Sequence, residues 1–402
     1  MIKKIAGNIC APKGFLAAGI HVGVRKNTEK ADLALIYSEQ PAAAAGVFTI
    51  NEVKAAPVIL TEKHLKHGTL QAIIVNSGNA NACTGKQGMS DAEQMAAATA
   101  AQFNISADKI AVSSTGVIGV PMPIEKITAG IEKIKSQLST NGDSAALAIM
   151  TTDTFPKSIA VEIELNKKTV RIGGIAKGSG MIHPNMATML SFITTDAAIS
   201  STALQQALTA SNKLSFNMIT VDGDTSTNDM VVVLANGMAQ NEKIDSMHHA
   251  DWQKFCDALA YVCIYLAKEV ARDGEGATKL IEMQVHGAVN ADQAQLAARA
   301  VCRSPLVKSA IYGEDANWGR IASALGTSGA EVDPEQLSIE LGTMMLLKNG
   351  TPLPFDEDAA REILKQKSIV IKANLGKGNA QATGWGCDLT PDYIKINISY
   401  RS

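Results

Sequence analysis

The chain alternates between segments whose apolar residues recur at helical spacing and shorter apolar runs that are typical of strands. The clearest helix runs from Trp252 to Val270 and stops before Gly274. Ser90 and Glu93 form a capping box that predicts a helix to about Phe103. Further helices are predicted at residues 123–138, 202–214, 291–302, 317–325 and 358–365. Strands are predicted at Asp32–Tyr37, Gly46–Ile50, Pro57–Leu60, Gln71–Val75, Ile110–Val112, Ser158–Leu165, Thr169–Ile175, Met189–Ile193, Met218–Val221, Met230–Leu234, Lys279–His286, Ser368–Asn374 and Tyr393–Ser399.

This mixture of helices and strands predicts an α+β fold built from layers of sheet and helix. The strands on either side of Asn166-Lys-Lys168 are expected to pair as a hairpin. The pattern changes near residue 285, which predicts a domain of residues 1–285 followed by a smaller domain of residues 286–402.

Composition narrows the function classes. The chain has 402 residues, of which 46% are hydrophobic and 19% charged, as in an ordinary globular protein. A formal net charge of −2 argues against a nucleic-acid partner, because such proteins present a basic face. No run approaches the ~20 apolar residues that span a bilayer, and Gly7, Asn8 and Pro12 interrupt any signal-like segment at the N-terminus. We therefore expect a cytoplasmic protein.

Metal and nucleotide chemistry are not favoured. Six cysteines are scattered along the chain without a C-x-x-C pair or a histidine cluster, so we expect buried free thiols and no zinc site. The glycine-rich segment Lys177–Gly180 has neither Walker spacing nor the spacing of a dinucleotide-binding loop, and a tight turn is its simpler interpretation. We expect no metal and no organic cofactor.

Residues 177–190 form the most informative stretch, because a glycine-rich turn leads through Thr188 into a buried strand. In the simpler interpretation, Thr188 packs its methyl group and bonds its hydroxyl to the backbone. In the sharper one, the Ala187–Thr188 bond is cut. The freed α-amino group, with an ordinary pKa near ~8, then activates the hydroxyl as a nucleophile. The residues by themselves leave both interpretations open.

Residues 177–190 resemble the corresponding segment of the self-cleaving ornithine acetyltransferases of arginine biosynthesis, also called the glutamate N-acetyltransferase family. The resemblance covers essentially the full chain, although the last residue is Ser402 where some relatives have Thr. The other motifs that carry it, in order, are Asn76–Gly85, Ser113–Gly119, Met150–Thr154, Asp222–Asn228, Arg272–Thr278 and the C-terminal tail.

The resemblance implies an αββα sandwich with a smaller C-terminal α/β domain. It also implies self-cleavage into chains of residues 1–187 and 188–402, which assemble as an α2β2 heterotetramer. In this family the cleaved enzyme moves an acetyl group from N2-acetyl-L-ornithine to L-glutamate through an acetyl-threonine intermediate, here on Thr188. Whether acetyl-coenzyme A also serves as an acetyl donor is left open by the sequence.

Two positions are implied as oxyanion donors. Taken alone, Thr115 and Gly116 form a plain turn after a short strand. By resemblance, the Thr115 hydroxyl and the Gly116 backbone N–H donate to the oxyanion of the tetrahedral intermediate, where one such donor is worth roughly 3–4 kcal/mol.

The remaining substrate contacts also come from the resemblance. Lys177 would meet a carboxylate, whereas Glu275, which follows a helix end where a carboxylate is unfavourable, would bind the amino group of the substrate. A chain terminus is generally frayed, so only the resemblance brings the tail to the site. The full set of implied substrate contacts is Thr151 (with Thr152 as the alternative), Lys177, Thr188, Glu275, Asn397 and Ser402.

Two rival hypotheses remain. A self-cleaving amidase or aminopeptidase would use the same nucleophile with water as acceptor, and the match of the full chain, tail included, is the feature against it. A non-catalytic binder of amino acids or phosphate would use the glycine-rich loops at 76–85 and 177–180, and it would remain one intact polypeptide. Small amino-acid substrates, and no nucleic acid or membrane, are the expected partners of the enzyme.

Overall fold

The computed structural model describes residues 1–183 and 189–398. The chain forms two compact units. The first comprises Met1–Gly178, Asn185–Phe216 and Thr225–Leu266, and the second comprises Ser179–Pro184, Asn217–Asp224 and Ala267–Ser402. The domain boundary predicted near residue 285 falls inside a strand of the second unit, β10 (Leu280–Ala288). As an assignment of independent domains it stays a prediction.

The first unit contains a nine-stranded sheet in the order β1-β6-β7-β8-β9-β3-β4-β5, with β2 also paired to β3. Its strands are β1 (Lys3–Ile5), β2 (Phe15–Ile20), β3 (Leu33–Phe48), β4 (Thr69–Asn79), β5 (Ile110–Val117), β6 (Lys157–Leu165), β7 (Lys168–Lys177), β8 (Leu190–Thr195) and β9 (Met230–Ala235). Its helices are α1 (Ala56–Leu65), α2 (Gly85–Phe103), α3 (Ile124–Ile134), α4 (Asp143–Ala148), α5 (Ser201–Lys213) and α6 (Trp252–Arg272), the last of which continues into the second unit.

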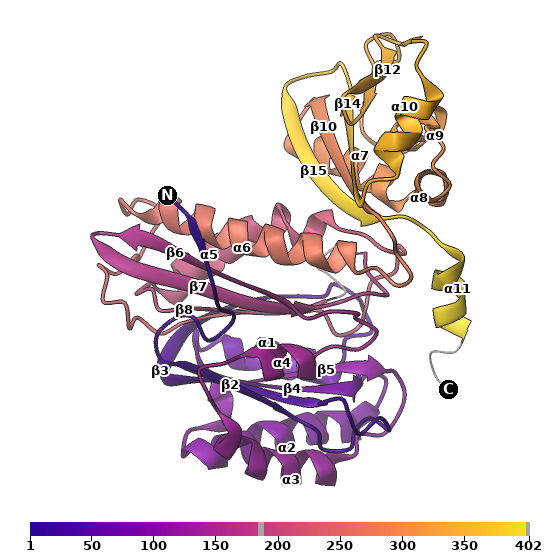
Figure 1. The fold of residues 1–402 in the computed structure, drawn as a ribbon. Helices are drawn as coiled ribbons and strands as arrows, with labels where there is room; N and C mark the ends of the chain where they lie inside the picture. The colour runs from indigo at the N-terminus through magenta and orange to yellow at the C-terminus, as the bar shows by residue number, and fades with distance from the viewer. Residues whose placement is uncertain (184–188, 399–402) are drawn as a thin grey trace. The chain divides into compact units, whose positions relative to one another are not determined.

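The sheet forms two layers because β3 belongs to both. Leu33–Tyr37 pairs with β2 and β4, whereas Ala43–Phe48 pairs with β9, and the register shifts between these halves. Figure 1 shows α2 and α3 below the layer that contains β2 and β4, and α6 above the layer that contains β6–β8. The predicted αββα sandwich is therefore confirmed in this unit.

Alternation along the strands fills two separate cores. Ile73 of β4 packs between the layers with Phe192 of β8, whereas Ile74 faces the other way, against α2 and α3. Phe192 has no exposed surface, and burying such a side chain contributes about 1.5–3 kcal/mol. The α3 helix buries Ile131 and its neighbours at the predicted helical spacing.

The second unit contains a six-stranded sheet in the order β13-β12-β11-β14-β10-β15. α7 packs against β10 and β15, which gives the expected smaller α/β unit (Figure 1). The other strands are β11 (Ser338–Leu341), β12 (Met344–Lys348), β13 (Thr351–Pro352), β14 (Ser368–Asn374) and β15 (Ala380–Cys387). The helices are α7 (Ala291–Arg303), α8 (Pro305–Tyr312), α9 (Trp318–Gly326), α10 (Glu357–Leu364) and α11 (Pro391–Ile398).

Several element predictions were wrong. The run Pro57–Leu60 lies in α1, where Pro57 occupies the first turn, because a short apolar run does not distinguish a strand from a buried helix. α2 begins at Gly85, so Ser90 is not its cap. Met218–Val221 makes only a single bridge, from Ile219 to Trp385, and does not form a strand. Tyr393–Ile398 is helical in α11.

Candidate functional site

The ends of β4 and β5 bring the predicted oxyanion residues to one edge of the first unit. Gly78 pairs with Gly116, and Thr115 pairs with Ser77 and Asn79. Gly116 has a φ of 137°, and a Cβ added to it would lie 2.3 Å from the carbonyl carbon of Gly78. Only glycine fits there, because the two strand ends approach so closely.

Lys177 meets Thr115 across this edge. It is the last residue of β7, where it pairs with Leu190 at the start of β8. Its side chain is buried, with 6% of the residue exposed, and its Nζ donates to the Thr115 hydroxyl at 3.4 Å. The structure thus brings together two predicted site residues that are separated by 62 positions in the sequence.

Charged side chains surround the Lys177 ammonium. Burial lowers its pKa, and the positive charges of Lys157 and Arg25 lower it further, whereas Asp153 and Asp229 oppose the shift. An ammonium in this position gains from any carboxylate that binds beside it, which is the role expected of Lys177.

Asp153 and Lys157 were missed by the sequence analysis. Both side chains have no exposed surface, and Lys157 Nζ lies 2.7 Å from Asp153 Oδ1. Although burial acts to raise the pKa of Asp153, the charges of Lys157 and Lys177 outweigh it and hold the pKa well below its usual range. A buried charge pair is costly unless it is well bonded, so a buried pair is a sign of a functional or structural role. The sequence does not show that this pair is buried, because its burial depends on the fold.

Thr151, one of the expected substrate contacts, is tied to this pair. Its backbone N–H donates to Asp153 Oδ2 at 2.9 Å, and its hydroxyl lies 3.5 Å from the same oxygen. This bond connects Thr151, and not Thr152, to Asp153. The same carboxylate also accepts the backbone N–H of Gly178, just after the end of β7. Which of the two threonines contacts substrate stays a prediction.

The motif Asn76–Gly85 has a structural role. The Asn76 amide donates to the carbonyl of Asn79 at 2.9 Å, and its oxygen accepts from the Ser114 hydroxyl at 2.6 Å. Asn228 ties the same region together, since its amide donates to the carbonyls of Ala80 and Ser114 at 2.6 and 2.8 Å. These polar residues hold the ends of β4 and β5 together.

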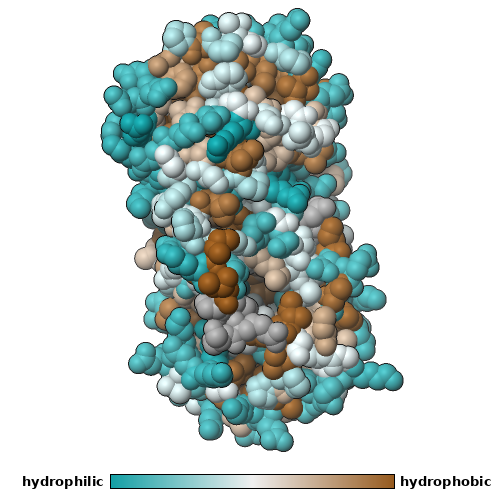
Figure 2. All heavy atoms as spheres, turned by 90° about the vertical axis from the view of Figure 1, so that its right-hand side faces the viewer, coloured by the Kyte–Doolittle hydropathy of each residue, from teal (hydrophilic) through white to brown (hydrophobic). Residues whose placement is uncertain are grey.

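In the second unit, Glu275 and Asn397 lie together. Asn397 on α11 donates from Nδ2 to Glu275 Oε2 at 2.8 Å, although α11 itself buries no residue. A Cβ on Gly180 would lie 2.4 Å from the Glu275 carboxylate, so glycine lets the carboxylate approach the turn. Ile394 and Ile398 of α11 are 58% and 80% exposed. Figure 2 shows that apolar side chains are exposed among hydrophilic ones on the face of the molecule that it presents.

The residues just before the predicted cleavage point are anchored within the second unit. Asp222 accepts backbone N–H bonds from Met181 at 2.6 Å and Ile182 at 2.9 Å, and it lies 3.4 Å from the Tyr393 hydroxyl. Burial raises the pKa of Asp222, and the backbone donors counter that shift. Met181 has a φ of 58°, which is uncommon outside glycine.

His183 is held on both sides of its ring. Its Nε2 lies 3.1 Å from a guanidinium nitrogen of Arg299, and its Nδ1 lies 3.1 Å from the Thr220 hydroxyl. Burial and the charges of Arg299 and Arg303 lower its pKa to about 4. The ring is therefore neutral at pH 7, with Nε2 as the acceptor.

Three predicted site residues, Ala187, Thr188 and Ser402, lie outside the described residues. Met189 and Leu190 lead from that segment into β8, and Leu190 pairs with Lys177. Among the residues that the structure describes, no group of histidine, cysteine or acidic side chains could hold a metal ion. The cysteines are free and mostly buried as expected, but Cys83 is exposed. No helix in the described ranges is long and apolar enough to cross a membrane.

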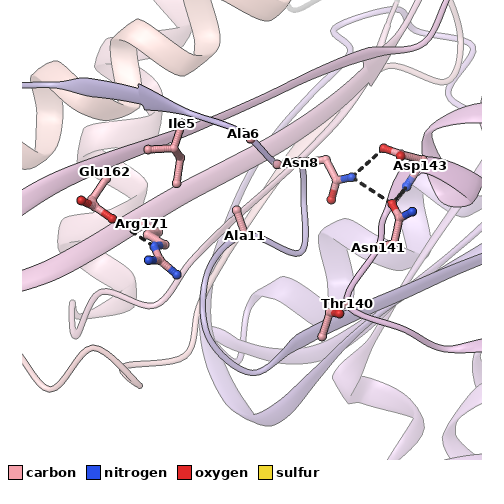
Figure 3. Close-up of a pocket in the computed structure, with 10 residues that line it drawn as sticks. Ile5, Ala6, Asn8, Ala11, Thr140, Asn141, Asp143, Glu162 and Arg171 are labelled. Carbon is pink, nitrogen blue, oxygen red and sulfur yellow. Dashed lines mark hydrogen bonds and ion pairs between the residues drawn. The ribbon is translucent and has the colours of Figure 1, made fainter.

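A separate pocket of about 550 Å³ lies elsewhere in the first unit (Figure 3). It contains none of the predicted site residues, and its charged groups already have partners. Arg171 pairs with Glu162 at 3.2 Å, and Asn8 donates to Asp143 at 2.7 Å. We therefore place the candidate site at the edge formed by Thr115 and Lys177.

Comparison with known sequences gives matches over the whole chain. The ArgJ family model matches residues 16–402. The chain is 56% identical over 400 residues to the arginine biosynthesis bifunctional protein ArgJ of Symbiobacterium thermophilum, covering 99% of each. It is 53% identical over 402 residues to the protein of that name from Bacillus subtilis, covering 100% of this chain and 98% of the relative.

Two solved structures are also similar. The crystal structure of the arginine biosynthesis bifunctional protein ArgJ from Bacillus halodurans has 52% identity and a TM-score of 0.52, and the match covers 53% of this chain and 100% of that chain. The ornithine acetyltransferase from Mycobacterium tuberculosis, complexed with ornithine, has 42% identity and a TM-score of 0.44, with 46% and 99% covered.

Proposed function

This chain belongs to the ArgJ family, and from that premise we propose that it transfers an acetyl group from N2-acetyl-L-ornithine to L-glutamate in arginine biosynthesis. The observation that carries the proposal is the contact of Lys177 with Thr115 at the edge where β5 ends and β8 begins. A buried cation beside a hydroxyl and the Gly116 backbone suits a substrate with a carboxylate and a carbonyl that becomes an oxyanion.

The reaction runs in two steps through Thr188. Its hydroxyl attacks the acetyl carbonyl, and its own α-amino group takes the proton. The Thr115 hydroxyl and the Gly116 N–H stabilise the oxyanion, which collapses and releases ornithine with that proton on its amine. The glutamate amine then attacks the acetyl-Thr188 ester through a second oxyanion. The Thr188 α-amino group takes the proton from that amine and returns it to the departing Thr188 oxygen, which releases N-acetylglutamate. The proposed role of Lys177 is to bind a substrate carboxylate, and that of Glu275, which Asn397 supports, is to bind a substrate amino group.

Self-cleavage between Ala187 and Thr188 precedes this chemistry, because only the freed α-amino group supplies the base. The Bacillus halodurans match supports a cut chain, since the whole of that chain covers 53% of this one. Residues 188–402 number 402 − 187 = 215, which is the same share of this sequence. The mature form is then two chains, which we propose assemble as an α2β2 heterotetramer, with Ser402 of the second chain contacting substrate.

The relatives are named bifunctional, and we propose that acetyl-coenzyme A serves as a second acetyl donor to Thr188. Purified enzyme given acetyl-coenzyme A and glutamate should release free coenzyme A, measured with a thiol reagent. Release that ignores glutamate would reveal hydrolysis, and no release at all would leave acetylornithine as the donor of this enzyme.

The steady-state kinetics of purified enzyme test the main proposal. Varying N2-acetylornithine at several glutamate concentrations should give parallel double-reciprocal lines, the sign of a covalent acetyl-enzyme. Intersecting lines would exclude that intermediate. Acetate formed at the same rate with or without glutamate would favour the amidase hypothesis, which the full-length family match disfavours.

A further inference from the structure

The buried ion pair Asp153–Lys157 lies beside the backbone of Thr151 and Gly178 at the candidate site. Neither residue has a role in the reaction described above. Lys157 opens β6 with no exposed side-chain surface, and its Nζ lies 2.7 Å from Asp153 Oδ1 and 4.9 Å from the centre of the Phe155 ring. An unassisted pair of this kind is often neutral or unfavourable for stability. Its bonds to neighbouring groups therefore point to a task in positioning.

Asp153 joins the two backbone segments that carry predicted substrate contacts. Its Oδ2 accepts from the backbone N–H of Thr151 at 2.9 Å. Its Oδ1 accepts from the backbone N–H of Gly178 at 2.7 Å, directly after Lys177. One carboxylate thus fixes the main chain at both places, while Lys157 fixes the carboxylate.

We propose that Asp153, held by Lys157, is a positioning residue of the acetyl transfer, because it fixes Thr151 and the Lys177–Gly178 peptide and keeps the Lys177 ammonium charged for the substrate carboxylate. This inference rests on the proposed role of Lys177. Asp153 acts through that lysine and does not touch the reacting atoms.

The charges around Lys177 explain why a carboxylate is needed there. Lys157 and Arg25 are cations that disfavour a third buried positive charge, and Asp153 is the stronger of the two carboxylates that oppose them, the other being Asp229. Without the Asp153 charge, burial and two cations act on Lys177 with little opposition. Lys177 would then lose its proton at a lower pH, and with it the attraction for a carboxylate.

The charge of Asp153 should be visible in the pH profile of the enzyme. The acid limb of kcat/KM reports the Thr188 α-amino group, which must be unprotonated, and the alkaline limb reports Lys177, which must be protonated. Asp153→Asn keeps the shape and one acceptor oxygen but removes the charge. The pKa that the alkaline limb reports should fall by about one pH unit. This is the lower end of the pKa shift that a neighbouring opposite charge causes. On the alkaline side of the shifted limb, KM for N2-acetylornithine should rise ~10-fold, with kcat changed less than ~3-fold.

Asp153→Asn leaves Lys157 buried without its carboxylate, which disfavours folding, and a second variant covers the case in which the first does not fold. Asp153→Asn combined with Lys157→Met removes one charge of each sign, and methionine replaces the apolar stem of lysine. The local charge sum is then unchanged, but Asp153 acts more strongly on Lys177 than Lys157 does, so the alkaline limb should return part of the way to the parent profile.

Asp196→Asn is the matched control. Asp196 is also fully buried and accepts backbone N–H bonds from Arg171 at 2.8 Å and Lys13 at 3.1 Å, but its bonds lie at the other end of β7 and β8. Its loss should lower the melting temperature and leave the alkaline limb in place.

The profiles are measured on cleaved enzyme, with the parent enzyme in the same assay. If the parent transfers acetyl but the limb stays fixed in both Asp153 variants, the positioning role is wrong while the proposed function survives. If the limb moves equally in the single and double variants, the charge argument fails. If the parent itself transfers no acetyl from N2-acetylornithine, the proposed function fails first.

Discussion

The two units hold their predicted site residues in opposite ways. In the first unit, Thr115 and Lys177 lie at strand ends, and a fully buried ion pair beneath them fixes the backbone. In the second unit, Glu275 is buried in a loop after α6, and its partner Asn397 sits on a short terminal helix that buries none of its residues. Strand ends locked by buried charges suit groups that must meet a transition state, because catalysis there depends on preorganisation. An exposed helix tied to its unit through side chains such as Asn397 and Tyr393 suits a group that only binds the substrate, because small movements cost little.

Substitutions at the predicted site residues test this difference between the two units. The largest effect on activity is expected at Thr188. Thr188→Ala removes both the hydroxyl that cuts the chain and the hydroxyl that accepts acetyl, so we expect one uncut chain of 402 residues without measurable transfer. The parent should run on a denaturing gel as chains of 187 and 215 residues, with Thr188 as the N-terminus of the second by Edman sequencing. An active enzyme that remains a single chain would contradict the nucleophile assignment, and Thr188→Ser, which keeps the hydroxyl, is the control.

The next largest effect is expected at Thr115 in the first unit. Thr115→Ala removes one oxyanion donor, so kcat should fall by ~10²–10³ with KM little changed. Thr115→Ser keeps the hydroxyl and should retain most activity. Self-cleavage also passes through an oxyanion, at the Ala187 carbonyl, so uncut precursor should accumulate in the Ala variant. Equal rates for the Ala and Ser variants, measured on cleaved enzyme of matched melting temperature, would remove Thr115 from the site.

A smaller effect, of a different kind, is expected in the second unit. Glu275→Gln removes the charge that attracts the substrate amino group, and a hydrogen bond to a charged group is worth ~1.5–3 kcal/mol. KM for N2-acetylornithine should therefore rise ~10- to 100-fold, with kcat reduced much less. The control is Glu340→Gln, a glutamate of the same unit that pairs with Lys372. A fall in kcat at unchanged KM would show that Glu275 acts in the transition state. It would then contradict the division of roles between the two units.

The smallest effect is expected at Asn397, which steadies the Glu275 carboxylate through a neutral amide. Asn397→Ala removes a hydrogen bond to the carboxylate, and only part of its strength affects the substrate, so KM should rise ~2- to 10-fold. Combined with Glu275→Gln, it should add little further, because both changes affect the same contact. Full additivity in this double-mutant cycle would show that Asn397 acts independently of Glu275.

Many elements of the fold follow from local patterns in the chain. Apolar periodicity predicted α3, α6 and the β6–β7 hairpin, since residues that share a face of one element are close in sequence. The motifs also identified the candidate site residues, and the family assignment bears out the resemblance on which they depended. Short apolar runs were the weak point: Pro57–Leu60 proved helical, because four residues are too few to separate one period from another.

The contacts that hold the site depend on long-range packing, which local patterns do not reveal. The pairing of Gly78 with Gly116, the contact of Lys177 with Thr115, and the bond from Gly178 to Asp153 each join positions that are distant in the chain. Asp153 and Lys157 are four residues apart and look in the sequence like any exposed i, i+4 pair. Their burial depends on the layers that close over them, and burial turns an ordinary surface pair into a strongly bonded one, because water no longer competes for either charge.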